Sequence, residues 1–215
     1  MIRHSPRPSP HPAICIAGAS LVKLRSQFVL TNLDEVTVNV KDKVGAMIAA
    51  IENDPAIAHV TFRASTQLEE GLRCSARARN LPPIIVDEPH RIGGTDLGMN
   101  PVELLLCAVG TCQEIMYSVY ASMLGIQLDE LRVTCKGTLD LHGLFGIRDV
   151  PAGLAAIEFE THIKSPASRE SIRELIDRAE RNCPIMDTVT RPVRSIGKAY
   201  LNGEEIHASG KNQAI

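Results

Sequence analysis

Two cysteines of this chain lie in sharply different sequence settings. Cys112 lies deep in a long apolar run of helical character, and Cys183 lies at the end of a second predicted helix, directly before Pro184. The two thiols are far apart in sequence, one on an apolar helix and the other beside a proline. This layout is typical of a site that reduces peroxides or exchanges disulfides. Because free cysteine is among the most often buried residues, simple space filling is the alternative for each thiol.

The other four cysteines are predicted to be structural. Cys107 precedes Cys112 by five positions, which places it about 140° around the helix, so we expect no disulfide between the two and read Cys107 as a core residue. Cys15, Cys74 and Cys135 fall in a terminal segment or in strand-like patterns. No closely spaced Cys or His ligands occur, so the sequence predicts no metal and no cofactor.

Composition excludes several classes of partner. The 215 residues carry a formal net charge of -2, and only 3% of them are aromatic, which argues against nucleic acid as a partner. The apolar run around Cys112 is interrupted by Glu103, Gln113 and Glu114, so we expect no membrane span. Four prolines within residues 1–12 argue against a secretory signal and favour an extended arm. We therefore expect a cytoplasmic protein, with its thiols reduced.

Periodicity and turn signals predict an α+β chain. The predicted strands cover residues 34–40, 57–68, 72–79, 83–86, 131–141, 155–164 and 193–201. The predicted helices cover about 40–51, 101–124 and 166–183. Strands, helix, strands, helix and strand in this order favour long helices packed on a mainly antiparallel sheet.

The start of the helix that carries Cys112 is well specified. Asn100 is a good cap, Pro101 suits the first helical position, and Glu103 lies three residues after the cap, as in a capping box. On this helix Glu103 lies about half a turn away from Cys112. Capping is therefore the role that we expect for Glu103.

The helix face around Cys112 is apolar throughout. Burial there disfavours the thiolate, so a reactive Cys112 needs a cation or a hydrogen-bond donor from elsewhere, and arginine is the natural choice. The residues that share this face are Leu105, Ala108, Val109, Ile115, Met116 and Val119.

Several motifs, in this order and spacing, resemble the OsmC/Ohr family (osmotically inducible protein C and organic hydroperoxide resistance proteins). The resemblance covers about residues 57–202 and divides the chain into an N-terminal extension (1–55), an OsmC-like domain (56–203) and a polar tail (204–215). The matching pieces are Asp87-Glu88-Pro89, Gly93-Gly94, residues 98–106, Cys112, Gly137–Asp140 and Cys183-Pro184.

The resemblance implies an assembly and a chemistry. It implies an intertwined homodimer with two long central helices, and an active site at the subunit interface that holds both cysteines. The Cys112 thiolate would attack the peroxide O–O bond, Cys183 would condense with the resulting sulfenic acid, and an external dithiol would reduce the disulfide. The apolar wall around Cys112 suggests a small organic hydroperoxide as substrate.

The sequence departs from the organic hydroperoxide reductases at the group that activates the thiol. They have a glutamate ten residues before the reactive cysteine, where this chain has Val102, with Glu103 one position later. Arg73, Arg91 and Glu103 are therefore the candidate activating residues, and Arg77 and Arg79 are further candidates from this chain or its partner.

Two other functions stay open. The same fold could be a non-enzymatic dimer that binds a small apolar ligand and uses its thiols for sensing or packing. It could also be a general dithiol–disulfide oxidoreductase. His142 is predicted to be a turn residue, and Asp87, Gly93 and Gly94 are predicted to shape the loop before the long helix.

Overall fold

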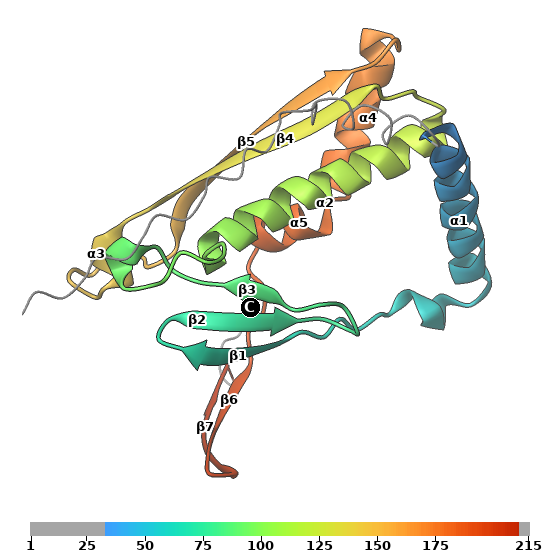
Figure 1. The fold of residues 1–215 in the computed structure, drawn as a ribbon. Coiled ribbons are helices and arrows are strands. Elements are labelled where there is room, and N and C mark those ends of the chain that lie inside the picture. The colour runs from blue at the N-terminus through green and yellow to red at the C-terminus, as the bar shows by residue number, and fades with distance from the viewer. Residues whose placement is uncertain (1–32, 211–215) are drawn as a thin grey trace, which may run out of the picture.

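The computed structural model describes residues 33–210, in which helices alternate with antiparallel strands (Figure 1). The predicted proline-rich arm and Cys15 lie outside these residues. The helices are α1 (Leu33–Asn53), η1 (Pro55–Ala58), η2 (His90–Ile92), α2 (Pro101–Leu124), α3 (Leu141–Leu144), α4 (Arg169–Arg181) and α5 (Pro184–Thr190). The strands are β1 (Ser65–Glu70), β2 (Arg73–Arg77), β3 (Ile84–Val86), β4 (Glu130–Leu139), β5 (Leu154–Lys164), β6 (Gly197–Leu201) and β7 (Glu204–Ser209).

The strands form three separate antiparallel groups within the chain. Their orders are β1-β2-β3, β4-β5 and β6-β7. The β4-β5 ladder is the longest, from the pair Glu130–Lys164 to the pair Leu139–Leu154. In Figure 1 this ladder runs along α2, whereas the β6-β7 hairpin projects away from the other elements. The α+β class is confirmed.

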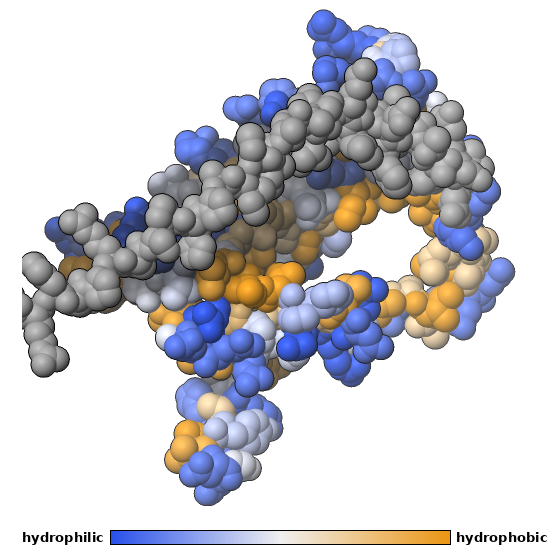
Figure 2. Space-filling model, viewed as in Figure 1, coloured by the Kyte–Doolittle hydropathy of each residue, from blue (hydrophilic) through white to orange (hydrophobic). Residues whose placement is uncertain are grey.

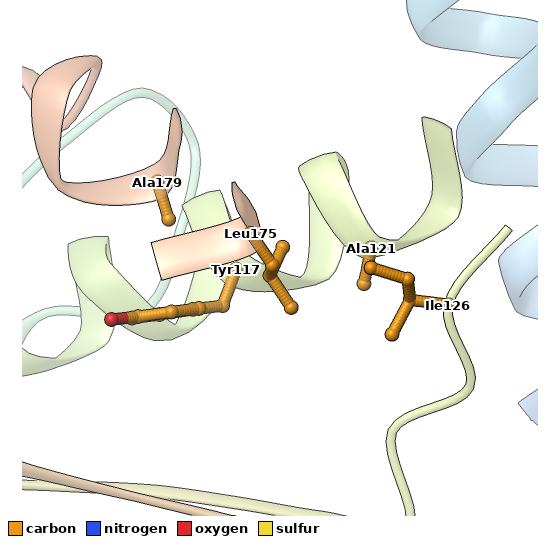
Figure 3. Close-up of a cluster of buried hydrophobic side chains, with 5 residues drawn as sticks. All are labelled: Tyr117, Ala121, Ile126, Leu175 and Ala179. Atoms are coloured by element: carbon orange, nitrogen blue, oxygen red, sulfur yellow. The ribbon is translucent and has the colours of Figure 1, made fainter. Parts of the chain in front are cut away.

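The core lies where α2, α4 and the β4-β5 ladder meet. Tyr117 and Ala121 of α2 face Leu175 and Ala179 of α4, and Ile126 closes the cluster (Figure 3). Tyr117, Leu175 and Ala179 are fully buried. Along β4, half-buried and exposed positions alternate strictly, as in a strand with one face against a helix.

The cap predicted for α2 is confirmed. The Asn100 Oδ1 accepts from the Glu103 backbone N–H, and the Glu103 carboxylate accepts from the Asn100 backbone N–H, both at 2.9 Å. Gly125 ends the helix with a φ of 68°. By length and composition α2 is apolar enough to cross a membrane, a test that core helices also pass. Here α2 packs against β4, α4, α5 and α1.

Three predictions about elements were wrong. Residues 34–40 belong to α1 and are not a strand, because Val36 and Val40 satisfy a helical spacing as well as an alternating one. Residues 57–64 are not strand either. Asp54 caps the turn η1, with Pro55 in its first turn, and strand pairing begins only at Ser65.

The third wrong prediction concerns the start of the polar tail. Residues 204–209 form β7, which pairs with β6. Asn202 and Gly203 between the strands have φ values of 51° and 93°. Asn-Gly is the preferred pair for a two-residue hairpin turn with both φ values positive.

Leu175 should contribute strongly to stability. Replacing it with Ala leaves a cavity between α2 and α4, and we expect a loss of about 2–5 kcal/mol in the free energy of unfolding, measured by urea denaturation. Leu144→Ala removes the same atoms from a side chain that is 48% exposed and should cost about 0.5 kcal/mol or less. Equal losses in the two variants would contradict this account of the core.

Candidate active site

The fold brings Cys112 and Cys183 together. Cys112 lies in the middle of α2, and Cys183 is the N-cap residue of α5, with Pro184 in the first turn. The Cys183 thiol and the Ile185 backbone N–H lie close enough to the Cys112 thiol to shift its pKa. Cys183 is fully buried, Cys112 is half-buried, and both are free thiols. Cys112 and Cys183 thus lie near each other in the fold.

A break between two helices positions Cys183. α4 ends at Arg181, and Asn182 follows as its C-cap. A proline at the first position of α5 needs no backbone N–H, so a new helix starts at once in a different direction. The chain thus turns at Cys183, between α4 and α5, both of which contact α2.

The surroundings of Cys112 favour its neutral form. Burial is the largest effect and raises the pKa of the Cys112 thiol, and the neighbouring Cys183 raises it further. The Ile185 N–H acts in the opposite direction because it stabilises the thiolate. The net shift is upward, as expected from the apolar face of α2.

Within residues 33–210 of this chain, no cation is among the groups that shift the pKa of Cys112. Arg73 follows the β1-β2 turn and forms an ion pair with Glu70 at 2.9 Å. Arg91 lies exposed in η2, and the Glu103 carboxylate is held in the capping box. None of the three candidate activating residues is thus seen acting on Cys112.

The loop between β3 and α2 is organised around the buried side chain of Asp87. Its carboxylate accepts the Thr95 hydroxyl and the backbone N–H groups of Glu88 at 2.8 Å, Thr95 at 3.0 Å and Leu97 at 3.3 Å. These bonds, the Thr95 hydroxyl first, lower the pKa of Asp87 to about 2. The loop-shaping role predicted for Asp87 agrees with this arrangement.

Both glycines of the pair in this loop are required by its backbone. Gly93 has a φ of 100°, a conformation that side chains disfavour. A Cβ atom on Gly94 would lie 1.8 Å from the Glu88 carbonyl oxygen, which leaves no room for any other residue. The loop is therefore tightly folded where it leads into the cap of α2.

His142 lies in α3, beyond the end of β4. Its Nδ1 is 2.8 Å from the Asp140 carboxylate, which also caps α3. This is the turn position predicted for His142.

Sequence reasoning missed a row of buried polar groups beside Cys112. Gln113 is fully buried, and neither amide atom has a hydrogen-bond partner within the described residues. One turn later the Tyr117 hydroxyl donates to Glu180 at 3.3 Å. Burial, together with the negative charge of Glu180, raises the pKa of Tyr117 to about 12. Gln113 and Tyr117 are four residues apart in a predicted helix. This spacing could have predicted from the sequence that the two side chains share one face.

Comparison with known proteins agrees with this arrangement. Residues 94–196, which include α2, β4, β5, α4, α5 and both cysteines of the pair, match the family model for OsmC-like protein. The chain therefore carries an OsmC-like domain. No curated protein matches the sequence.

Solved structures share the fold at low sequence identity. An OsmC-like protein from Mycoplasma pneumoniae is 24% identical with a TM-score of 0.53, over 60% of this chain and 87% of that one. A protein from Psychrobacter arcticus is 16% identical with a TM-score of 0.51, over 62% and 91% of the two chains. An organic hydroperoxide resistance protein OsmC from Legionella pneumophila is 17% identical with a TM-score of 0.45, over 61% and 90%. The first two support the predicted OsmC-like fold.

Asp87 should make the stability of this protein depend on pH in the acid range. Because its pKa in the folded protein is lowered to about 2, its ionised form stabilises the fold above about pH 4, and this contribution is lost as the pH falls toward 2. We expect Asp87→Asn to lower the melting temperature by several degrees at pH 7. The difference from the unsubstituted protein should shrink between pH 4 and pH 2.

Asp96→Asn is the matched control for this measurement. Asp96 lies in the same loop, is exposed and has a φ of 56°, a conformation that Asn also tolerates. Its substitution should leave the melting temperature nearly unchanged. A gap between Asp87→Asn and the unsubstituted protein that stays constant down to pH 2 would refute the role of the ionised carboxylate.

Proposed function

We propose that this chain is a thiol-dependent hydroperoxide reductase of the OsmC type, and that it acts in the cytoplasm as a homodimer. The observation that carries the proposal is the contact between Cys112 on α2 and Cys183 at the start of α5. The match of residues 94–196 to the OsmC-like family supports a redox role related to peroxides.

The proposed reaction uses both thiols in turn. The Cys112 thiolate attacks one oxygen of the hydroperoxide, the O–O bond breaks, and the alkoxide leaves as an alcohol after it takes up a proton. Cys112 is then a sulfenic acid. The Cys183 thiol attacks its sulfur, which forms the disulfide and releases water. An external dithiol reduces this disulfide by exchange and becomes oxidised itself.

The local groups fit distinct parts of this sequence. The Ile185 N–H supplies a donor to the Cys112 thiolate. Burial of Cys183 keeps it from competing oxidants while it stays in reach of Cys112. The apolar face of α2 favours an organic hydroperoxide over hydrogen peroxide, because an apolar substituent gains from contact with it.

The dimer is proposed because apolar side chains remain uncovered beside the site. Leu105 and Ile115, which share the helix face of Cys112, are 39% and 61% exposed. Figure 2 shows hydrophobic surface around an opening bordered by α2, α1 and the β1-β2-β3 sheet. Exposed apolar surface of this kind marks an interface, and a second copy of the chain would cover it. Other large exposed apolar residues are Phe62, Leu68, Ile84, Ile85 and Met99.

The dimer also offers a source for the missing cation. Arg73 is held by Glu70 next to the turn of an exposed hairpin, from which it can reach a partner subunit. We propose that Arg73 activates Cys112 across the interface, in place of the glutamate-held arginine that Val102 cannot support. Arg91, Arg77 and Arg79 are the remaining candidates.

Mass spectrometry after one equivalent of cumene hydroperoxide tests the two-cysteine mechanism. The unsubstituted reduced protein should form a Cys112–Cys183 disulfide. Cys183→Ser should instead accumulate a sulfenic acid on Cys112, because the resolving thiol is absent, and Cys112→Ser should stay unmodified at Cys183.

Cys74→Ser is the control. Cys74 lies on β2 with its thiol directed to the Leu72 carbonyl oxygen, so this variant should behave like the unsubstituted protein. Unmodified Cys112 and Cys183 after prolonged exposure would sink the peroxidase proposal. The dimer that binds an apolar ligand would then take its place, a role favoured by the raised pKa of Cys112. A disulfide formed by an oxidised dithiol but not by the peroxide would favour general disulfide exchange.

Removal of the Arg73 charge should slow the first step. In Arg73→Met the pKa of Cys112 should rise by about one unit or more, and the rate of iodoacetamide alkylation at pH 7 should fall about tenfold with the thiolate fraction. Arg169→Met, at the start of α4, removes a charge far from the hairpin and should leave the rate unchanged. Equal rates in Arg73→Met and the unsubstituted protein would exclude Arg73 as the activating residue.

A further inference from the structure

A hydrogen bond joins the middle of α2 to the last turn of α4, close to where the chain reaches Cys183. The Tyr117 hydroxyl on α2 donates to the Glu180 carboxylate at 3.3 Å. Tyr117 is fully buried, and Glu180 is half-buried. Glu180 is the residue before the last of α4, and Cys183 follows three residues later. The bond therefore ties to α2 the part of α4 that leads directly into Cys183.

The backbone of Glu180 also holds Cys183. The Cys183 backbone N–H donates to the Glu180 carbonyl oxygen at 3.4 Å, and the Cys183 carbonyl oxygen accepts from the Asp187 N–H at 2.9 Å. The Cys183 side chain makes no capping hydrogen bond to α5, so its thiol stays available to other groups. Glu180 thus contacts Tyr117 through its side chain and Cys183 through its backbone.

The Tyr117 side chain extends toward the part of α2 that carries Cys112. Long side chains in a helix lean toward its N-terminus, and Cys112 precedes Tyr117 by five residues. Figure 3 shows the ring lying along α2, with its hydroxyl directed away from Ala121 in the following turn. Burial, together with the charge of Glu180, raises the pKa of Tyr117 to about 12. The hydroxyl therefore keeps its proton at neutral pH and remains a donor.

We propose, on the basis of the reductase function above, that Tyr117 and Glu180 position Cys183 for the resolving step. In that step the Cys183 sulfur attacks the sulfenic acid on Cys112. The S–S bond forms, the S–O bond breaks, and the thiol proton and the hydroxyl leave together as water. The attack needs the two sulfurs in a defined geometry, so a small displacement of Cys183 slows it strongly. Tyr117 and Glu180 act through the location of Cys183 and transfer no proton themselves.

The first step should depend much less on this hydrogen bond. Cys112 lies in the middle of α2, so the backbone of that helix fixes its location without help from α4. Cys183 and the Ile185 N–H shift the pKa of Cys112 in opposite directions. A displacement that moves both groups away from Cys112 therefore has partly cancelling effects on the thiolate fraction.

Rapid quenching after one equivalent of cumene hydroperoxide separates the two steps. Mass spectrometry follows the loss of the Cys112 thiol, with dimedone to trap the sulfenic acid, and then the formation of the disulfide. Tyr117→Phe removes the hydroxyl and keeps the ring. We expect its first step to change by less than about twofold and its disulfide formation to slow about tenfold.

Substitutions of Glu180 test the same bond from the side that water can reach. Glu180→Gln keeps an oxygen that accepts from the Tyr117 hydroxyl and should retain most of the resolving rate. Glu180→Leu removes the acceptor and should be as slow as Tyr117→Phe. The double variant Tyr117→Phe/Glu180→Leu should be no slower than either single variant, because both remove one shared interaction.

Tyr200→Phe is the matched control. The Tyr200 hydroxyl donates to Glu205 at 3.5 Å within the β6-β7 hairpin, which projects away from α2 (Figure 1). Its substitution removes the same atom from a tyrosine–glutamate pair and should leave both rates unchanged. An unchanged resolving rate in Tyr117→Phe would overturn the proposal. So would a Glu180→Gln variant as slow as Glu180→Leu, since the hydrogen bond would then not be the cause.

Failure of the reductase function gives a different result, in which the unsubstituted protein forms no sulfenic acid with the peroxide. The equilibrium of the Cys112–Cys183 disulfide with glutathione then tests the positioning role without any peroxide. Tyr117→Phe should lower the equilibrium constant for disulfide formation about tenfold, and Glu180→Gln should largely preserve it. An equilibrium constant that is the same in Tyr117→Phe and the unsubstituted protein would refute the positioning role.

Discussion

Close packing of α4 on α2 is the constraint on which the candidate active site depends. Leu175 and Ala179 are fully buried against Tyr117, and the small side chain of Ala179 lets the two helices approach closely. Cys183 follows Ala179 by one helical turn, so this contact also fixes where α4 stops and where Cys183 lies. The pairing of the two thiols is thus a product of the core rather than of a flexible loop.

Burial assembles the thiol pair and at the same time opposes its ionisation. The desolvation that raises the pKa of Cys112 accompanies the packing that brings Cys183 to it. The Ile185 N–H partly offsets this effect because the break before α5 turns a backbone donor toward the sulfur. The packing therefore fixes the geometry of the two thiols. A positive charge from another segment or subunit is still needed to lower the pKa of Cys112.

Local signals in the sequence predicted the long elements well. Asn100, Pro101 and Glu103 specify the start of α2, and the upward shift of the Cys112 pKa follows from the apolar face of that helix. The meeting of Cys112 with Cys183 was expected from their two sequence settings and from the family resemblance, whereas spacing along the chain does not fix their contact. The valines of residues 34–40 suited two periodicities, and the choice of a strand was wrong.

Contacts between elements were beyond what sequence patterns could provide. Cys107 was predicted to be a structural core residue, but it is exposed, and Cys135 is half-buried. The sequence of a helix or a strand does not state which faces will meet. Burial alternates along β4, and Gly110 of α2 has no side chain. In the structure these two features let the Cys135 side chain contact α2 at Gly110. The burial of the Gln113 amide, which has no hydrogen-bond partner within residues 33–210, is equally invisible in the sequence.

The division of the strands into three groups has a consequence for how the chain reaches its fold. Each group pairs only strands that follow one another along the chain, so most sheet contacts close over short loops. Proteins dominated by such local contacts fold fast, because little chain entropy is lost before each contact forms. The contacts of α2 with α4 and α5 join residues that are distant in sequence, so we expect them to form more slowly during folding. These are the contacts that bring the two thiols together.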